Sequence, residues 1–365
     1  MLPSGRSRHR LRAHAHAGGL LVRTLDLPGS RRGSSSAAVV EEGTFGGRPT
    51  TIVRPRSRGP WPAVLFANGA TPDGRAHPGV RRLGIALARS GYIVFIPDLP
   101  GIATGELTPR TLAAAVECAV AAADSAEARE GRVGLVGVSV GGTLALLSAT
   151  APELRSRVSV VACIAPYTDL EKVMMLATTG TYPGSTGPEP YAVPPSLPVG
   201  LARSVVAILP PTADARVLEQ ALQRLDPEAP DPLLPLRKTP CRSLDSAAAA
   251  VQALLINRDP YRFPDFYAAL PGSVRNMAAA LSPVRSAAKL VAPVEIASAP
   301  RDKYFPLAES HALARAAPDV RITVTSALAH AIPRMSFTNL AGIAALHSFF
   351  VRSLAAASSH AVASA

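Results

Sequence analysis

The pentapeptide Gly137-Val138-Ser139-Val140-Gly141 decides how the rest of this sequence is interpreted. It follows the apolar run 133–136 and precedes a helix-like stretch at 143–149, so a strand, a sharp turn and a helix are predicted in that order. Glycine two residues before and two residues after the serine allows the strand and the helix to run close together. We expect this strained turn to hold the Ser139 hydroxyl clear of the sheet, as a nucleophile.

Strand-like and helix-like segments alternate on both sides of the turn, which is typical of a parallel sheet with helices on both faces. The expected strands are 39–45, 50–53, 62–67, 92–96, 133–138, 158–164, 291–297 and 320–325. The expected helices between them are 76–90, 108–130, 143–149, 307–316 and 339–355. The sequence therefore predicts an α/β protein with a doubly wound, mostly parallel sheet.

The alternation stops between residues 166 and 282. A proline-rich stretch at 180–198 predicts a loop, and helical patterns follow it at 199–209, 213–225, 243–257 and 272–280. We predict an inserted, mainly helical lid over 166–282 and a core formed by 38–165 and 283–356. The arginine-rich segment 1–37 and the segment 357–365 are expected to be a disordered and a frayed tail.

Composition excludes several classes of partner. The chain has 365 residues and a formal charge of +12, but the first 60 residues carry 11 of the arginines, so the body is only mildly basic. No arginine run is interleaved with aromatic residues, so no nucleic-acid partner is expected. No secretion signal is predicted, and no apolar run is long enough for a membrane span or integral membrane contact.

Cysteine and histidine usage argues against metal and disulfide chemistry. Cys118, Cys163 and Cys241 are widely spaced, which favours neither a disulfide framework nor a zinc site and suits a cytoplasmic protein. The pair His14 and His16 lies in the arginine-rich segment, where a solvated tail is favoured over a metal site. We expect no metal and no cofactor.

A serine hydroxyl needs a base to take its proton and a carboxylate to orient that base. His330, which follows the last expected strand, is the candidate base, and His77, in the loop after the third strand, is its rival. Asp302, in the turn after strand 291–297, is the candidate acid, although a surface ion pair with Arg301 or Lys303 is the alternative interpretation. Asp169 is the backup acid.

Two backbone N–H groups are needed to bind the carbonyl oxygen as it becomes negative. One is predicted at Val140, where the helix after Ser139 begins, and the other at Gly69 or Ala70, in the loop after strand 62–67. Two neighbouring side chains are candidates for substrate binding. They are Asn68 and Tyr167, although Tyr167 is as readily a turn residue.

Together these motifs resemble the α/β-hydrolase superfamily over residues 39–165 and 283–356. The resemblance is carried by Asn68-Gly69, by Asp98-Leu99-Pro100-Gly101, by the pentapeptide around Ser139, by Asp302–Pro306 and by His330. It implies the Ser-Asp-His chemistry of the superfamily at Ser139, Asp302 and His330. Many members have His-Gly where this chain has Asn68-Gly69. The dienelactone hydrolase branch is similar in its core but carries a cysteine nucleophile, so Ser139 favours ordinary ester chemistry.

The sequence thus predicts a serine hydrolase that cleaves a small-molecule carboxylic ester through an acyl-enzyme. Apolar lid stretches and lid aromatics suggest a substrate with an apolar part, unless these residues form only the core of the lid; the aromatics are Tyr261, Phe263, Phe266 and Tyr267. An acyltransferase of the same fold would use identical residues, and an exopeptidase is also compatible with the fold. A catalytically silent binding or scaffold protein is disfavoured, because all three catalytic candidates are present.

Overall fold

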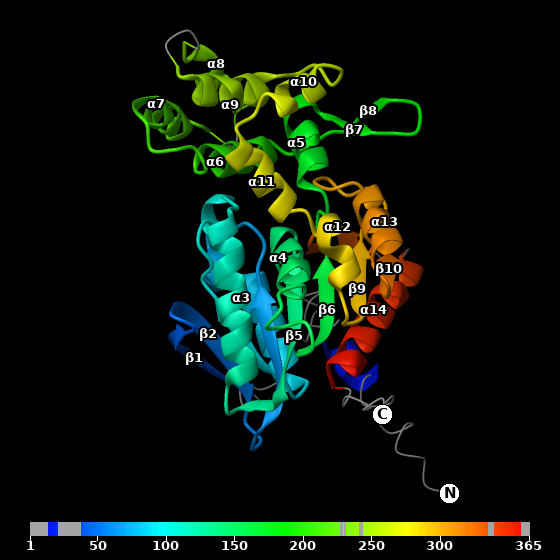
Figure 1. Ribbon diagram of the computed structural model, residues 1–365. Helices are drawn as coiled ribbons and strands as arrows, with labels where there is room; N and C mark the ends of the chain where they lie inside the picture. The colour runs from blue at the N-terminus through cyan, green and yellow to red at the C-terminus, as the bar shows by residue number, and fades with distance from the viewer. Residues whose placement is uncertain are drawn as a thin grey trace, which may run out of the picture.

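The computed structural model describes residues 14–20, 38–226, 229, 231–240, 244–334 and 339–358. Its centre is an eight-stranded sheet in the order β1-β2-β4-β3-β5-β6-β9-β10 (Figure 1). The strands are β1 (Ala38–Phe45), β2 (Arg48–Pro55), β3 (Trp61–Ala67), β4 (Ile93–Pro97), β5 (Ala128–Val138), β6 (Val158–Ile164), β9 (Val294–Ser298) and β10 (Val320–Val324). The predicted fold class, a doubly wound and mostly parallel sheet, is confirmed.

Only β2 runs against the other strands of this sheet, pairing antiparallel with both β1 and β4. The turn between β1 and β2 is Gly46-Gly47, and both glycines have positive φ, 56° and 72°. Such angles are required in the two-residue turns whose twist matches that of antiparallel strands. The remaining pairings are parallel, so the carboxyl ends of β3, β4, β5, β6, β9 and β10 lie at one edge of the sheet.

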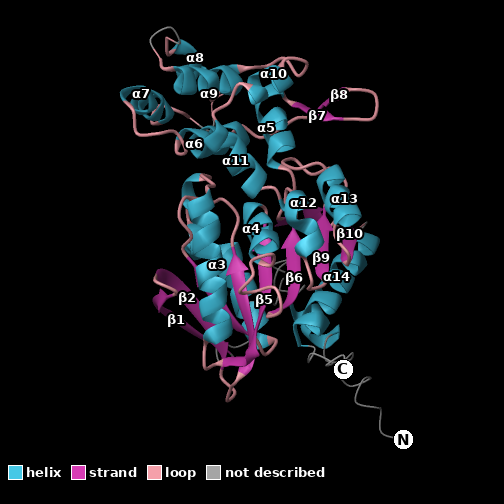
Figure 2. Cartoon of the chain, in the orientation of Figure 1, coloured by secondary structure: helices cyan, strands magenta, loops and turns pink. Residues whose placement is uncertain are grey.

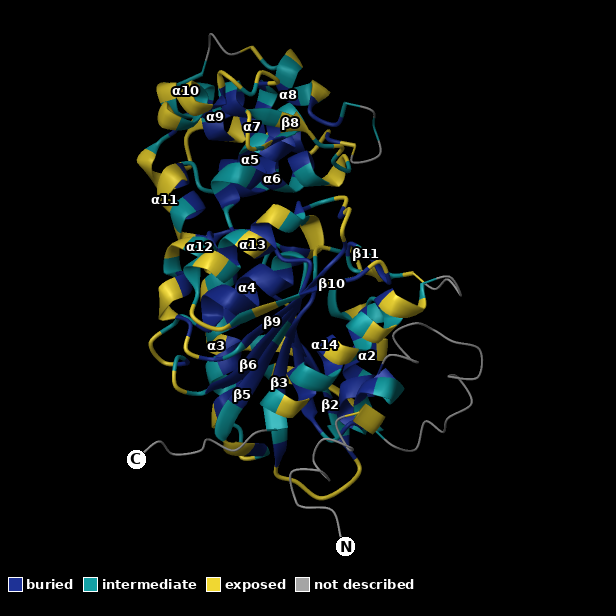
Figure 3. Ribbon diagram, turned by 90° about the vertical axis from the view of Figure 1, so that its right-hand side faces the viewer, coloured by how far each residue is buried: buried dark blue, intermediate teal, exposed yellow. Residues whose placement is uncertain are grey.

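Helices cover both faces of the sheet (Figure 2). Leu83 and Leu87 of α2 (Pro78–Arg89) pack in one apolar cluster with Phe349 and Phe350 of α14 (Leu340–Ser358). The other face carries α3 (Pro109–Asp124), α4 (Val140–Ser148) and α13 (Leu307–Ala316), which belong to a second and larger cluster. The inner strands β3, β4, β6 and β9 are almost wholly buried (Figure 3), whereas β1 at one edge of the sheet is largely exposed.

A mainly helical insertion lies over the edge of the sheet toward which the parallel strands point (Figure 1). Its elements are α5 (Leu170–Thr179), β7 (Thr181–Pro183), β8 (Pro188–Pro190), α6 (Ser196–Val206), α7 (Ala213–Leu222), α8 (Leu234–Lys238), α9 (Ser246–Ile256), α10 (Phe263–Ala268) and α11 (Gly272–Ala280). The chain then returns to the sheet through α12 (Pro283–Ser286). The elements of the insertion fall between residues 170 and 280.

Several element predictions differ from the structure. Helix α3 ends at Asp124 instead of near residue 130, because residues 128–132 extend β5 and Ala128 pairs with Trp61. The stretch 180–198 is not loop throughout, since β7 and β8 pair there and α6 begins before its end. The sequence analysis also missed α5, whose short apolar pattern was too brief to separate from a loop.

The expectation of a disordered tail is wrong for residues 14–20, which form a helix. Ala17 and Leu20 are buried in the apolar cluster of α2 and α14, and the ring of His14 stacks on that of His347 at 5.5 Å. The rest of the predicted N-terminal tail lies outside the described residues, as do Cys241 and residues 359–365 of the predicted C-terminal tail. Residues 357 and 358 belong to α14.

Among the described residues, α14 alone is long and apolar enough to cross a membrane, by length and composition only. Leu346, Phe349 and Phe350 on one of its faces are buried against the sheet. Tyr92, which precedes β4, also donates a hydrogen bond of 2.8 Å to the Leu354 carbonyl. These contacts are those of a core helix.

Candidate active site

Ser139 occupies the sharp turn between β5 and α4, with φ 54° and ψ −128°. A Cβ atom at Gly137 would lie 2.2 Å from the Gly141 carbonyl oxygen, and one at Gly141 would lie 2.1 Å from the Ala67 carbonyl oxygen. Only glycine fits at such distances. The turn therefore has the close strand-to-helix approach that the spacing of the two glycines predicts.

Asp302 and His330 meet at the same edge of the sheet. The Nδ1 atom of His330 lies 2.9 Å from each carboxylate oxygen of Asp302, and both residues are buried. Because a carboxylate only accepts, Nδ1 is the donor, and in the neutral imidazole Nε2 has the lone pair. Asp302 is itself oriented, since its Oδ1 accepts hydrogen bonds from the N–H groups of Tyr304 at 2.8 Å and Phe305 at 3.0 Å.

Local structure also fixes the imidazole of His330. The residue stands at the first position of a two-residue turn between β11 (Leu328–Ala329) and β12 (Ile332–Pro333), with φ 55°. The ring of Tyr304 lies 4.4 Å from the His330 ring, and that of Phe305 lies 5.7 Å from it. Among the described residues no hydrogen bond joins His330 to Ser139, a bond that often forms fully only with substrate bound.

The rivals of these residues have other partners. His77 caps α2, where its Nδ1 atom accepts a hydrogen bond from the Gly79 N–H at 3.2 Å. Asp169 lies before α5 and pairs with Lys172 at 3.4 Å. The structure thus places Asp302, and not Asp169, against His330.

Gly69 lies close to the serine turn. A Cβ atom on it would lie 3.2 Å from the Val138 carbonyl oxygen and 3.3 Å from Ser139 Cβ. The side chain of Asn68 is buried and donates a hydrogen bond to the Gly69 carbonyl at 2.9 Å. This bond fixes the peptide group between Gly69 and Ala70. Val140 is the first residue of α4, so its N–H has no partner within the helix. The backbone of Gly69 and the N–H of Val140 therefore both border Ser139, whereas Ala70 is exposed.

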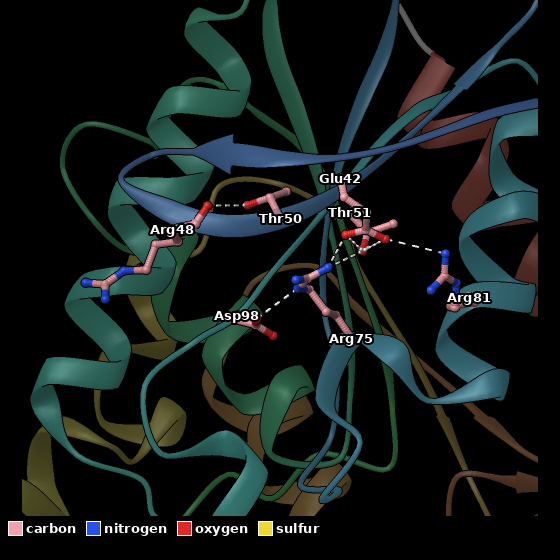
Figure 4. A network of polar contacts seen from close by, with 7 residues as sticks. All are labelled: Glu42, Arg48, Thr50, Thr51, Arg75, Arg81 and Asp98. Atoms are coloured by element: carbon pink, nitrogen blue, oxygen red, sulfur yellow. Dashed lines mark hydrogen bonds and ion pairs between the residues drawn. The ribbon is translucent and has the colours of Figure 1, made fainter.

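An arginine missed in the sequence analysis anchors the far end of this loop (Figure 4). Arg75 donates to Asp98 Oδ2 and to Thr51 Oγ1, each at 2.8 Å, and to Glu42. The hydrogen bond with Asp98 is the largest cause that raises the pKa of Arg75 above its usual value. The loop that begins at Asn68 is thus tied to β1, to β2 and to the end of β4. Sequence spacing gives no signal for this network, because its members come from separate elements.

Tyr167 lies deeper than a residue that lines an open pocket. It is 2% exposed, its ring contacts that of Phe305 at 5.3 Å, and its carbonyl accepts from Thr143 Oγ1 of α4 at 2.8 Å. Its hydroxyl has no hydrogen-bond partner among the described residues, and burial raises its pKa. Tyr167 therefore forms part of the packing between α4 and the Asp302 loop, and its predicted contact with substrate stays a prediction.

The base of the insertion is fastened by a buried carboxylate. Glu309 of α13 accepts hydrogen bonds from the Thr168 N–H at 2.6 Å, the Asp169 N–H at 2.7 Å and the Tyr182 hydroxyl at 2.5 Å. Burial is the largest cause that raises the pKa of Glu309. The returning chain closes the same point, since the Val284 N–H donates to the Thr168 carbonyl at 3.0 Å.

The aromatic residues expected to line a pocket lie in one part of the insertion. They belong to or adjoin α10, on the side of the insertion that faces away from the sheet (Figure 1). Phe263 stacks on Tyr267 at 5.8 Å, Arg262 lies 4.7 Å over Phe266, and Tyr261 is exposed. These residues therefore form part of the insertion's own structure.

Among the grooves on the described part of the chain, two are placed here by the residues that line them. One lies between β10 and α14, and the other between α7 and α8. Neither is lined by Ser139, Asp302 or His330. Within the described residues no group of three or more His, Cys, Asp or Glu side chains is arranged to hold a metal ion.

Comparison with known protein families finds a match to part of the chain. The family model of X-Pro dipeptidyl-peptidases of the S15 family matches residues 49–194, a stretch that includes β2 to β6 and the serine turn. Such a sheet, with a G-x-S-x-G turn after β5 and the order Ser, Asp, His along the chain, is the arrangement of one superfamily. The chain has the α/β-hydrolase fold. The S15 model covers less than half of the chain.

Solved structures similar to this chain are distant in sequence. Acylaminoacyl peptidase of Pyrococcus horikoshii is 14% identical with a TM-score of 0.46, and the match covers 80% of this chain but 37% of the peptidase. A serine hydrolase of Cycloclasticus zankles is 15% identical with a TM-score of 0.41, covering 79% and 89%. The esterase rPPE is 15% identical with a TM-score of 0.47, covering 92% and 88%. No curated protein matches the chain.

Proposed function

We propose that this α/β-hydrolase is a serine acyl hydrolase that cleaves carboxylic esters through an acyl-enzyme. The observation that carries the proposal is the buried Asp302–His330 pair, at the same sheet edge as the strained turn of Ser139. Such a pair supplies the base that a serine hydroxyl needs at neutral pH.

The proposed reaction has two halves. The Nε2 atom of His330 takes the proton of Ser139 Oγ as that oxygen attacks the ester carbonyl, and Asp302 stabilises the imidazolium that forms. The N–H groups of Val140 and Gly69 bind the negative oxygen of the tetrahedral intermediate. His330 then gives its proton to the leaving alcohol, and in the second half it activates the water that releases the acid.

Peptide bonds are the second candidate substrate. The matching family model is that of X-Pro dipeptidyl-peptidases of the S15 family, and this activity can be tested on a peptide substrate. Esters are the first choice because an alcohol leaves more readily than an amine, so the same residues face a lower barrier. We further propose that the insertion acts as a lid, with the apolar faces of α5 and α6 near the substrate.

Labelling with a fluorophosphonate tests the reaction type. We expect the wild type to be labelled and both Ser139→Ala and His330→Ala to remain unlabelled. A folded wild type that resists labelling would contradict the proposal and would favour a binding or scaffold protein.

Turnover then distinguishes the substrate classes. The rates for p-nitrophenyl acetate, p-nitrophenyl octanoate and Gly-Pro-p-nitroanilide should show esters hydrolysed and the anilide spared. The reverse preference would replace the esterase by a peptidase. Transesters formed in the presence of added alcohols would identify an acyltransferase.

A further inference from the structure

One side chain of the insertion reaches the loop that carries Asp302. Tyr191 follows β8, and its hydroxyl donates a hydrogen bond to the backbone carbonyl of Asp302. The N–H of Tyr191 donates to the Gly180 carbonyl at 2.8 Å, which closes the base of the β7–β8 hairpin. The hairpin is therefore joined to the acid loop by a side chain whose backbone is itself fixed.

The Tyr191 hydroxyl is suited to remain a donor. Burial, together with the nearby charge of Asp302, raises the pKa of Tyr191 to about 12. The hydroxyl thus keeps its proton throughout the neutral range, where His330 would have to act as a base.

A second contact from the insertion reaches the same loop. Ser196, the first residue of α6, has its Oγ atom 3.3 Å from the Tyr304 hydroxyl. Tyr304 in turn packs its ring on His330 and donates its N–H to Asp302. The hydroxyls of Tyr191 and Ser196 therefore both contact residues that hold the His330 imidazole in place.

We propose that Tyr191 is a positioning residue, through which the hairpin of the insertion sets the geometry of the Asp302–His330 pair. This inference rests on the proposed function of that pair. With the hydroxyl in place, the Asp302 peptide cannot rotate without breaking a hydrogen bond. Without it, Asp302 is held only by the N–H groups of Tyr304 and Phe305, and we expect the two 2.9 Å contacts with His330 to lengthen. Displacements of about 1 Å in such sites cost up to roughly 100-fold in rate.

The chain offers a matched control for this proposal in Tyr182. This tyrosine belongs to the same hairpin, but its hydroxyl contacts Glu309 and not the acid loop. Tyr191→Phe and Tyr182→Phe therefore each remove one hydroxyl group from the hairpin region. The first removes a hydrogen bond to the Asp302 carbonyl, and the second removes one to Glu309.

The two variants should behave in opposite ways. For Tyr191→Phe we expect kcat on p-nitrophenyl acetate to fall roughly tenfold, with KM and Tm nearly unchanged. The low-field proton NMR signal of the His330 Nδ1–H should weaken or move. For Tyr182→Phe we expect a lower Tm, because a buried carboxylate loses a donor, with kcat and the NMR signal retained.

The outcomes separate this inference from the proposed function. If Tyr191→Phe keeps the wild-type kcat and NMR signal while His330→Ala is inactive, Tyr191 has no positioning role and the hydrolase proposal stands. If both tyrosine variants lose the same activity and the same Tm, the contact is merely structural. If Ser139→Ala is as active as the wild type, the proposed function fails, and the NMR comparison still decides whether Tyr191 holds the pair.

Discussion

The Nδ1 atom of His330 lies 2.9 Å from both carboxylate oxygens of Asp302, although the two residues come from loops after different strands. The backbone of His330 has a φ of 55°, an angle that residues other than glycine rarely adopt. The surrounding turn, the rings of Tyr304 and Phe305, and the carboxylate together offset that strain.

Asp302→Asn should lower kcat roughly 10³-fold or more with little change in KM. The amide can no longer hold the proton on Nδ1 or stabilise the imidazolium, so Nε2 loses its role as base. Steady-state hydrolysis of p-nitrophenyl acetate measures the effect. Asp169→Asn is the control, and we expect less than a tenfold loss because that carboxylate pairs with Lys172. Equal losses in both variants would argue against Asp302 as the acid.

Gly141→Ala should destabilise the protein by about 3 kcal/mol or more. The added methyl group would lie 2.1 Å from the Ala67 carbonyl oxygen, so α4 would have to move away from β3. Urea unfolding followed by circular dichroism measures the change. Gly134→Ala in β5 is the matched control, because its nearest neighbours would lie at ordinary contact distance, 3.5 Å and beyond. A Gly141→Ala protein as stable as the control would show that the close approach is not required.

Arg75→Gln should lower kcat about tenfold without abolishing fluorophosphonate labelling. The loop of Gly69 would lose its anchor to Asp98, Thr51 and Glu42, so its N–H would be held less firmly beside Ser139. Arg81 also pairs with Glu42, at 3.4 Å, but lies in α2. Arg81→Gln should therefore keep kcat within about twofold, and an equal effect of the two substitutions would contradict the role of Arg75.

The contribution of Glu309 to stability should fall as pH rises. Its pKa in the folded chain is raised above the ordinary value of 4.5, so the folded state holds this proton more tightly than the unfolded state. The contribution is complete below pH 4.5 and is lost as pH rises through the folded-state pKa. The free energy of unfolding of the wild type relative to Glu309→Gln should accordingly decrease with pH from 4.5 upward. A difference that grows with pH would mean that the hydrogen bonds donated to the carboxylate outweigh its burial.

The sequence predicted the sheet well because its signals are local. Apolar runs bounded by turn residues marked β6 and β10 to within a residue, and α13 matched its expected range. The strand-to-helix turn at Ser139 was also predictable, because the spacing of Gly137 and Gly141 around the serine indicates it. These features depend on neighbours within a few residues.

What the sequence analysis missed depends on contacts between distant segments. The helix at 14–20 is stabilised by burial of Leu20 against α2 and α14, which no local pattern indicates. The anchoring roles of Arg75, Glu309 and Tyr191 arise only when separate elements meet. The Asp302–His330 contact was predictable because both residues follow neighbouring parallel strands, whose ends must lie side by side.

The pairing of β6 with β9 also affects how the chain folds during its synthesis. Val161 pairs with Val294, so the whole insertion must be synthesised before the central strand acquires its second neighbour. Until then β6, with the sequence Val-Ser-Val-Val-Ala-Cys-Ile, is an exposed and uncharged edge of the kind on which nascent chains aggregate. The Val284 N–H, which donates to the Thr168 carbonyl, brings the two ends of the insertion together about ten residues before β9 begins, and so places β9 beside that free edge.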